Sequence, residues 1–355
     1  MKCKIEDIVE VTMGQSPKSQ YYNTEGNGVP FLQGNRTFGY KRPTFDTYTT
    51  LVTKSAKAGD VIMSVRAPVG DLNITPVEMC LGRGVCSLRM KNGNQEFLYY
   101  MMKYYMPQLL NKESGTVFGS VNRNDINGLE VDIPEDTDKQ KKIARYLTMI
   151  DDKVELNTEI NKNLKQQAQA IYQQMFITNR NPNWENGLLS DLVAVRYGKD
   201  HKKLKDGVYP VYGSGGIMRY VEKPLYTGES VLIPRKGTLN NVMYVNGAFW
   251  SVDTMFYTEM LRSNVAKFVY HFVKSKDLAS MNAGSAVPSM TTNILNAMQL
   301  YIPDNEILST FEEIVSPMYS QMQENEKQSK KLADLRDTLL PRLMSGELDI
   351  SEIEF

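Results

Sequence analysis

The chain is poor in the residues on which metal sites, disulfide frameworks and nucleophilic catalysis depend. Its 355 residues include three cysteines and two histidines. Cys3, Cys80 and Cys86 are odd in number and have no CxxC spacing, which argues against both a disulfide framework and a zinc knuckle. With only His201 and His271 beside them, we expect no metal site, and no Ser/His/Asp or Cys/His arrangement can be proposed for catalysis.

Long apolar runs are also missing. No run approaches the roughly 18 residues of a membrane span, and the N-terminal segment MKCKIEDIVEV carries acidic residues where a signal peptide needs an apolar core. A hydrophobic fraction of 41% and a charged fraction of 23% are typical of a soluble globular protein. We therefore expect a cytoplasmic protein, and its length favours two or more compact units.

The formal net charge is zero, which taken alone argues against a nucleic-acid partner. The charge is unevenly distributed along the chain, however. Counting Lys and Arg against Asp and Glu gives +2 for residues 1–134, 0 for 135–186, +5 for 187–303 and −7 for 304–355. The acidic excess therefore lies at the C-terminal end, and the two segments before the predicted long helices are basic.

The strongest organising signal is an internal repeat. The stretch GTVFGSVNRNDINGLEVDIP at 115–134 reappears, in one constant register, as GSAVPSMTTNILNAMQLYIP at 284–303. In the first copy Leu129, Val131 and Ile133 alternate as in a half-buried strand. The positions that match between the copies are Gly115 with Gly284, Ser120 with Ser289, Asn124 with Asn293, Asn127 with Asn296, Ile133 with Ile302 and Pro134 with Pro303. The period is too long for a solenoid and indicates a duplicated domain-plus-helix.

Each copy is followed by a predicted long helix, at residues 137–178 and 304–346. Apolar residues recur at alternating steps of four and three, and the two seams match in the register that places Asn157 on Asn325. Each helix of about 40 residues is roughly 60 Å long at 1.5 Å per residue. We expect an antiparallel coiled coil in which Asn157 and Asn325 approach each other at a pseudo-twofold axis. The seam positions expected to form the pair and dock partners are Ile143, Ile150, Val154, Asn157, Leu164, Ile171, Met318, Met322, Asn325, Leu332 and Leu339.

The remaining sequence predicts two mixed, mainly β domains at residues 1–136 and 187–303, so the expected fold class is α+β. Both are rich in Gly, aromatic residues and short β-type runs such as DVIMSV and SVLIP, with turn signals such as EGNG and GSGG between them. The run EFLYYMMKYYMPQLL predicts a helix within the first domain. Residues 179–186 are expected to be a linker, and residues 347–355 an acidic tail.

Basic residues gather in loop-like stretches of both domains beside aromatic residues. NRTFGYKRP and YGKDHKKLKDG are the clearest examples. Such loops suit DNA contact, because Lys and Arg displace counterions from phosphates while aromatic or amide groups reach bases. A solvated loop face explains about half of these residues individually. The predicted DNA-binding residues are Lys18, Arg36, Lys41, Arg42, Arg123, Lys199, Lys202, Lys203, Lys205, Arg219, Arg235 and Lys236.

Three motifs that resemble catalytic or cofactor sites are better explained by structure. VYGSGG at 211–216 lacks the acidic residue of a dinucleotide fold and favours a tight turn. NPNW at 181–184 is similar to the Asn-Pro-Pro-aromatic loop of amino-methyltransferases, but Asn183 occupies its third position and the segment is expected to be a linker. DDK at 151–153, with PE at 134–135 upstream, imitates part of a nuclease metal site. It lies on the predicted coiled-coil helix, where such charges normally form the solvated face.

Taken together, these segments resemble the specificity subunits of Type I restriction-modification enzymes. IARYLTMIDDKVELNTEINKNLKQQAQAIYQQMF and LRDTLLPRLMSGEL look like the two conserved helical regions of that family. VTMGQSPKSQYYN, FLQGN and YPVYGSGGI resemble stretches of its target recognition domains. On this resemblance, residues 1–136 and 187–303 are two target recognition domains, and residues 137–178 and 304–346 are the conserved helices.

The resemblance implies a protein without chemistry or cofactor of its own. It would present two methyltransferase subunits to a bipartite, asymmetric site in double-stranded DNA. Those subunits would bring S-adenosylmethionine and methylate adenine, and translocase-nuclease subunits can join to cut unmethylated DNA. Both recognition domains are compact for the family, and the target bases cannot be read from the sequence.

Two other classes of protein stay open at this point. One is a DNA methyltransferase or nuclease with its own recognition domains, which the missing cofactor loop disfavours. The other is a coiled-coil adaptor without DNA binding, which the basic charge of the two domains disfavours.

Overall fold

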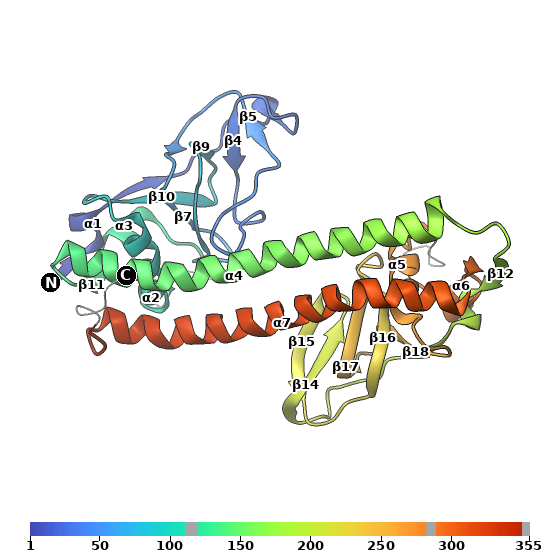
Figure 1. Ribbon diagram of the computed structural model, residues 1–355. Coiled ribbons are helices and arrows are strands. Elements are labelled where there is room, and N and C mark those ends of the chain that lie inside the picture. The colour runs from blue at the N-terminus through green and yellow to red at the C-terminus, as the bar shows by residue number, and fades with distance from the viewer. Residues whose placement is uncertain (111–118, 282–288, 350–355) are drawn as a thin grey trace. The chain divides into compact units, whose positions relative to one another are not determined.

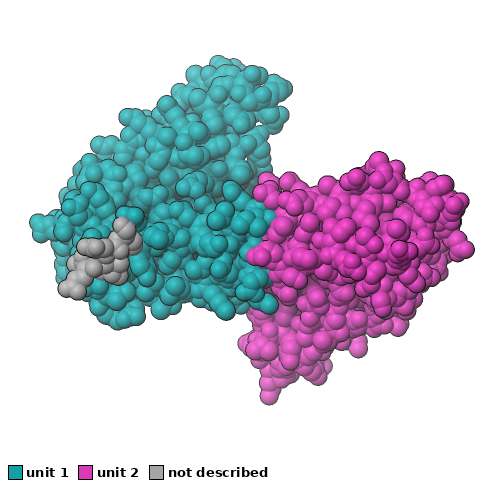
Figure 2. Space-filling model, in the orientation of Figure 1, with its two compact units in different colours: residues 1–160, 324–355 teal, residues 161–323 magenta. Residues whose placement is uncertain are grey.

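The computed structural model describes residues 1–110, 119–281 and 289–349, which form two compact units (Figures 1 and 2). Unit 1 comprises residues 1–160 and 324–355, and unit 2 comprises residues 161–323. Each unit therefore contains one mainly β domain and a part of both long helices. The first residues of both copies of the repeat, among them Gly115 and Gly284, and the end of the predicted acidic tail lie outside the described residues.

Unit 1 is built on a four-stranded sheet of order β2-β10-β7-β8 and a five-stranded sheet of order β3-β5-β4-β9-β6, with a small β1-β11 sheet. Its strands are β1 (Lys2–Lys4), β2 (Val9–Met13), β3 (Tyr22–Asn23), β4 (Val29–Leu32), β5 (Tyr48–Thr49), β6 (Ser55–Ala56), β7 (Val61–Ser64), β8 (Leu72–Ile74), β9 (Met79–Leu81), β10 (Val85–Met90) and β11 (Glu130–Asp132). Its short helices are α1 (Ile5–Ile8), α2 (Gln95–Leu110) and α3 (Arg123–Asn127), with a 3₁₀ turn at Ser19–Tyr21. The apolar side of α2 packs on the four-stranded sheet and on both long helices in one core.

Unit 2 is built on a six-stranded sheet of order β13-β18-β16-β17-β14-β15 and a small β12-β19 sheet. Its strands are β12 (Glu185–Leu188), β13 (Val193–Tyr197), β14 (Asp206–Gly213), β15 (Gly216–Val221), β16 (Tyr226–Pro234), β17 (Met243–Ser251), β18 (Met255–Met260) and β19 (Gln299–Ile302). Its short helices are α5 (Ala266–Lys274) and α6 (Thr292–Asn296), with a 3₁₀ turn at Leu189–Asp191. The predicted fold class of two mixed, mainly β domains and two long helices is confirmed.

The repeat has a direct structural counterpart in the two units. In unit 1 Val121 N donates to Val65 O at 3.1 Å, and in unit 2 Met290 N donates to Arg235 O at 2.9 Å. The helix that follows is capped in both copies, by the side chain of Asn122 before α3 and of Thr291 before α6. The predicted strand-like alternation is confirmed, since Leu129, Val131 and Ile133 are all buried.

The two long helices are α4 (Thr137–Tyr172), which continues as a π-helical turn at Gln173–Thr178, and α7 (Asn305–Met344) (Figure 1). Within each unit they run antiparallel. In unit 1 Asn157 Nδ2 donates to Asn325 O at 3.4 Å, and in unit 2 Asn161 Nδ2 donates to Met322 O at 3.1 Å. The predicted approach of Asn157 to Asn325 is therefore present, although the acceptor is a backbone carbonyl rather than the other amide side chain.

Among the described residues, no helix has both the length and the apolar composition needed to cross a membrane.

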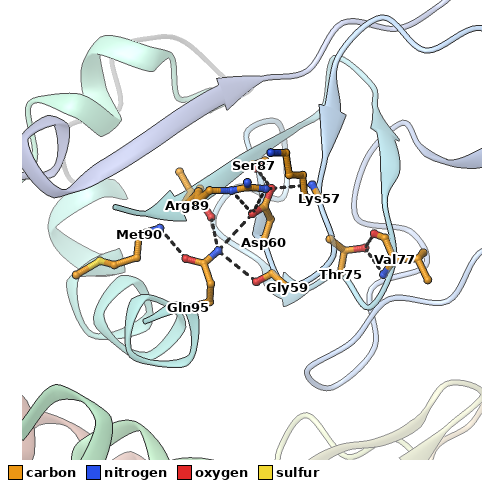
Figure 3. A network of polar contacts seen from close by, with 10 residues as sticks. Lys57, Gly59, Asp60, Thr75, Val77, Ser87, Arg89, Met90 and Gln95 are labelled. Carbon is orange, nitrogen blue, oxygen red and sulfur yellow. Dashed lines mark hydrogen bonds and ion pairs between the residues drawn. The ribbon is translucent and has the colours of Figure 1, made fainter. Parts of the chain in front are cut away.

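A buried carboxylate ties the sheet of unit 1 to α2 (Figure 3). Asp60, which is 3% exposed, accepts from the guanidinium of Arg89 at 2.7 and 2.8 Å and from Ser87 Oγ at 2.8 Å. It also accepts from the backbone N–H of Lys57 at 2.9 Å and from Gln95 Nε2, at the start of α2, at 3.3 Å. This network holds the 57–60 turn, β10 and α2 in one arrangement.

Replacing Asp60 by alanine should destabilise unit 1 by about 1–3 kcal/mol, because it leaves the buried hydroxyl of Ser87 without its acceptor and removes the counterion of Arg89. The measurement is urea-induced unfolding of the full chain, followed by circular dichroism. Asp46→Ala is the matched control, since it breaks the exposed ion pair with Arg36 and should leave the transition almost unmoved. Equal transitions for both variants would show that the network contributes nothing to stability.

Candidate nucleic-acid interface

In each unit, a loop that carries exposed lysine follows a glycine that lies tight against the backbone of the sheet. A Cβ added to Gly14 would lie 2.0 Å from Gly82 O, and one added to Gly198 would lie 2.0 Å from Val252 O, so neither place accepts a side chain. Gly14 N and Gly198 N donate to Val85 O and Met255 O, both at 3.0 Å. The chain therefore leaves both sheets through equivalent backbone contacts.

The loop of unit 2 carries four of the predicted lysines on a fixed backbone. Trp250 Nε1 donates to Lys199 O at 2.8 Å, and the backbone N–H of Lys202 donates to Asp200 at 3.0 Å. That backbone bond is the main reason why the pKa of Asp200 lies below its usual range. Lys199, Lys202, Lys203 and Lys205 are exposed, and within the described part of the chain their ammonium groups form no ion pair. Four unpaired cations on a held loop suit phosphate contact.

Arg235 and Lys236 extend this surface. The guanidinium of Arg235 lies 5.5 Å from the ring centroid of Tyr197 and donates to Asp253 O at 3.1 Å. Tyr197 is 52% exposed and lies two residues before Lys199. Lys236 is exposed, and its backbone forms an antiparallel bridge with Ser289 of the repeat. An exposed aromatic ring beside an arginine can contact bases next to lysines that contact phosphates.

The hairpin β14–β15 presents apolar side chains next to these cations. Its exposed members are Val208 at 76%, Met218 at 61% and Ile217 at 50%. VYGSGG contains the turn of this hairpin, as its composition predicts, at Ser214 and Gly215 between the paired residues Gly213 and Gly216. Arg219, in β15, is held by Asp206 at 2.7 Å and by Leu204 O, so its charge is already neutralised within the unit.

Unit 1 carries an equivalent cationic surface, with two members that the sequence prediction missed. Lys18 is exposed in the loop after Gly14. The backbone of Arg66 forms an antiparallel bridge with Ser120, as the backbone of Lys236 does with Ser289. Arg83 is exposed, and its backbone N–H donates to Ser16 Oγ at 3.0 Å. The sequence repeat matches only Ser120 with Ser289. The backbone bridges to these two serines, which the structure shows, relate Arg66 to Lys236.

Several residues of unit 1 that were predicted to contact DNA instead contact acidic side chains or backbone carbonyls of the protein. The prediction for Lys41 is wrong, since its side chain is fully buried and pairs with Glu96 at 2.8 Å. Arg42 is exposed but pairs with Glu155 of α4 at 2.7 Å. Arg36 pairs with Asp46 at 2.7 Å, and Arg123 donates to a backbone carbonyl of β2. Lys18, Arg66 and Arg83 are therefore the better candidates in this unit.

The predicted seam residues all face inward. Ile143, Ile150, Val154, Asn157, Met322 and Asn325 are buried, and Leu164, Ile171, Met318, Leu332 and Leu339 are half-buried. Among them, Asn157 forms hydrogen bonds across the helix pair with Asn325, Gln328 and Ser329. The buried seam residues are not accessible to a partner, whereas docking by the half-buried ones stays a prediction. The apolar residues that the long helices expose are Met149, Leu156, Ile314 and Leu335.

The motifs resembling catalytic sites have structural roles. Asp151 of DDK is fully buried and pairs with Arg336 at 2.8 Å. Trp184 of NPNW is buried, and its Nε1 donates to Asp304 at 3.3 Å. Across residues 1–110, 119–281 and 289–349, no group of three or more His, Cys, Asp or Glu side chains is placed to hold a metal ion.

Comparisons with known proteins identify the family of the chain and a protein of similar fold. The family model described as the Type I restriction modification DNA specificity domain matches residues 1–166 and 181–333. The MjaX specificity subunit of a type I restriction enzyme of Methanocaldococcus jannaschii is 35% identical over 47% of this chain and 39% of its own length. The MjaIX specificity subunit of the same organism is 23% identical over 99% of this chain and 94% of its own. The crystal structure of the S subunit of a Type-I restriction-modification system from M. genitalium is similar in fold, with a TM-score of 0.66 at 17% identity over 99% of this chain and 96% of that one.

Proposed function

This chain belongs to the family of type I restriction-modification DNA specificity proteins, and we propose that it recognises a bipartite, asymmetric DNA site and docks two methyltransferase subunits. The observation that carries the proposal is the pair of matching cationic surfaces, one in each unit. One unit with one cationic surface accounts for the recognition of one half-site. Two units with the same frame and different loops support two half-sites of different sequence.

Within each half-site, the side chains divide into two roles. The unpaired lysines of the loops after Gly14 and Gly198 contact phosphates and fix the position of the unit on the duplex. Arg235 with Tyr197 in unit 2, and Arg66 with Arg83 in unit 1, lie next to backbone positions that form matching hydrogen bonds and bridges in the two units, and they reach base edges or the groove. Arginine is suited to guanine because its planar fork matches two acceptors on that base.

The specificity subunit is the non-catalytic member of the complex. S-adenosylmethionine belongs to the methyltransferase partners, and translocase-nuclease subunits join for cleavage. The internal repeat supports two equivalent docking surfaces for two equal partners. Exposed apolar residues of the long helices, such as Met149 and Leu156 one heptad apart, supply the kind of surface that a permanent partner buries.

The chain alone is therefore expected neither to methylate nor to cleave DNA. Adding its methyltransferase partner should confer adenine methylation at a two-part site, measured by transfer of labelled methyl groups and by sequencing of the methylated positions. The partner without this chain is the control. Methyl transfer by the chain alone would contradict the proposal and favour an enzyme with its own recognition domains. A complex that forms but binds no DNA would favour an adaptor.

A further inference from the structure

A buried ion pair joins the two long helices to the β domain of unit 1. Asp151 of α4 is fully buried, and its Oδ1 accepts from Arg336 Nη1 of α7 at 2.8 Å. Two tyrosines of the β domain donate to the same carboxylate, Tyr40 to Oδ1 and Tyr100 to Oδ2, both at 2.8 Å. Arg336 also donates to the Tyr40 hydroxyl. Four segments of chain thus meet on one carboxylate, and a charge buried this deeply is tolerated only while its partner is present.

The residues next to Tyr40 fasten the same loop, residues 35–46, to the helix. Lys41 Nζ contacts Glu96 at 2.8 Å and Thr148 of α4 at 3.2 Å. Arg42 pairs with Glu155 of α4 at 2.7 Å. Three consecutive residues of the loop therefore contact α4, which fixes the orientation of the loop on the helices.

The other side of the loop supports the cationic surface of unit 1. Asn35 Nδ2 donates to Asp71 at 2.5 Å and lies 3.5 Å from Pro68 O, two residues beyond Arg66. Just before the loop, Gln33 O accepts from Gly84 N, next to Arg83, at 2.9 Å. Arg336 is thus connected by hydrogen bonds to Asp151 and Tyr40, and from Tyr40 along the loop to Asn35 and Gln33. These two residues hydrogen-bond to the backbone next to Arg66 and Arg83.

In unit 2, a different set of side chains joins the β domain to the long helices. In the register that matches Asn157 with Asn325, Asp151 corresponds to Tyr319 and Arg336 to Ala168. The tyrosine hydroxyl lies 3.0 Å from Nε2 of His271, whose Nδ1 lies 2.8 Å from Gln169 Oε1. Burial lowers the pKa of His271 to about 4, so this cluster is uncharged at neutral pH. The charged link between the two long helices is therefore a property of unit 1.

The ion pair formed by α5 in unit 2 also has the opposite polarity to the ion pair formed by α2 in unit 1, because α5 supplies the cation and α2 supplies the anion. Aligning the two helices on the Phe-x-Tyr pattern that both contain matches Glu96 with Lys267. Lys267 is 5% exposed in its side chain and contacts Glu229 at 2.8 Å and Glu312 at 2.5 Å. The equivalent position is therefore cationic in α5 and anionic in α2. Each β domain thus matches the face of the long helices in its own unit and not the face in the other unit.

From these contacts, and resting on the proposed function, we propose that Arg336 is a positioning residue for DNA recognition. It lies outside the recognition domain, yet through Asp151 and Tyr40 it holds the loop 35–46 and the cationic surface of unit 1 in one orientation on the helices. Its influence is confined to the half-site that unit 1 reads.

The test uses the full chain in complex with its methyltransferase partner and two conservative variants, Arg336→Lys and Tyr40→Phe. The lysine keeps the charge but cannot contact Asp151, Asp337 and Tyr40 together, and the phenylalanine removes only the hydroxyl. Sequencing of methylated sites should show relaxed base preference at one half-site, with discrimination there reduced roughly tenfold and the other half-site unchanged. Asp337→Asn, which alters only the exposed partner of Arg336, is the matched control.

Hydrogen exchange of the free chain provides a second measurement that needs no DNA. The backbone amides of residues 35–46 should exchange roughly tenfold faster in both variants and at the normal rate in Asp337→Asn. Unchanged exchange with an unchanged target site would overturn the proposal, and so would equal relaxation of both half-sites. A wild-type complex that methylates nothing would instead contradict the proposed function, and the exchange rates would still decide whether Arg336 positions the loop.

Discussion

Replacing Lys199, Lys202, Lys203 and Lys205 together by alanine is expected to flatten the salt dependence of DNA binding by up to about four units of slope. Each phosphate that a protein neutralises contributes about 0.9 to the slope of log K against log salt, because counterions are released. If all four lysines contact phosphates, affinity near 0.1 M salt should fall by roughly a thousandfold. The measurement is fluorescence anisotropy of labelled duplex over a series of salt concentrations.

A matched control removes the same charge from a different surface. Lys153, Lys162, Lys327 and Lys331 are exposed on the long helices, and replacing these four by alanine changes the net charge equally. The salt slope of this variant should stay near that of the wild type. Equal slopes for both variants would mean that only net charge matters, and an unchanged slope for the loop variant would place the phosphate contacts elsewhere on the two units.

The fold could be predicted from the sequence wherever a signal repeats along the chain. The duplicated strand and proline indicated the symmetry, and the seam indicated both long helices, because each is a periodic pattern that burial imposes on neighbouring residues. No periodic pattern in the sequence marks the boundary between the two compact units. It cuts both helices, between residues 160 and 161 and between 323 and 324, because each half of a helix packs on a different β domain.

The candidate site was only partly predictable, for a physical reason that Lys41 illustrates. A lysine in a basic, aromatic loop resembles a phosphate contact, and nothing nearby in the sequence reveals that Glu96 and Thr148 surround its ammonium group. Asp151 and Arg336 are separated by 185 residues, and their pairing depends on the antiparallel register of the helices. Arg66 was also not predictable from the repeat, because the repeat matches Ser120 with Ser289 and only the backbone bridges to these serines relate Arg66 to Lys236.

Removing one heptad from both long helices, residues 158–164 and 326–332, is expected to shorten the spacer of the recognised DNA site. A deletion of one heptad keeps the seam in phase and shortens each helix by about 10 Å at 1.5 Å per residue. At 3.4 Å per base pair, this corresponds to roughly three base pairs. The deletion removes Gln328 and Ser329, which accept from Asn157 Nδ2, and Asn157 no longer lies opposite Asn325. It retains the Asp151–Arg336 and Arg42–Glu155 pairs, so the ion pairs that join the β domain of unit 1 to the helices stay in place.

The result depends on whether rotation about the duplex can be accommodated. Three base pairs turn the second half-site by about 100°, given roughly 10.5 base pairs per turn, so the shortened protein either selects a spacer near the new length or loses methylation altogether. Sequencing of methylated genomic sites from the complex separates these outcomes, and both agree with helices that set the distance. A three-residue deletion from each helix is the control, because it breaks the seam and should unfold the pair rather than change the spacer. An active heptad-deleted protein that keeps its original spacer would show that something other than the long helices fixes the separation of the half-sites.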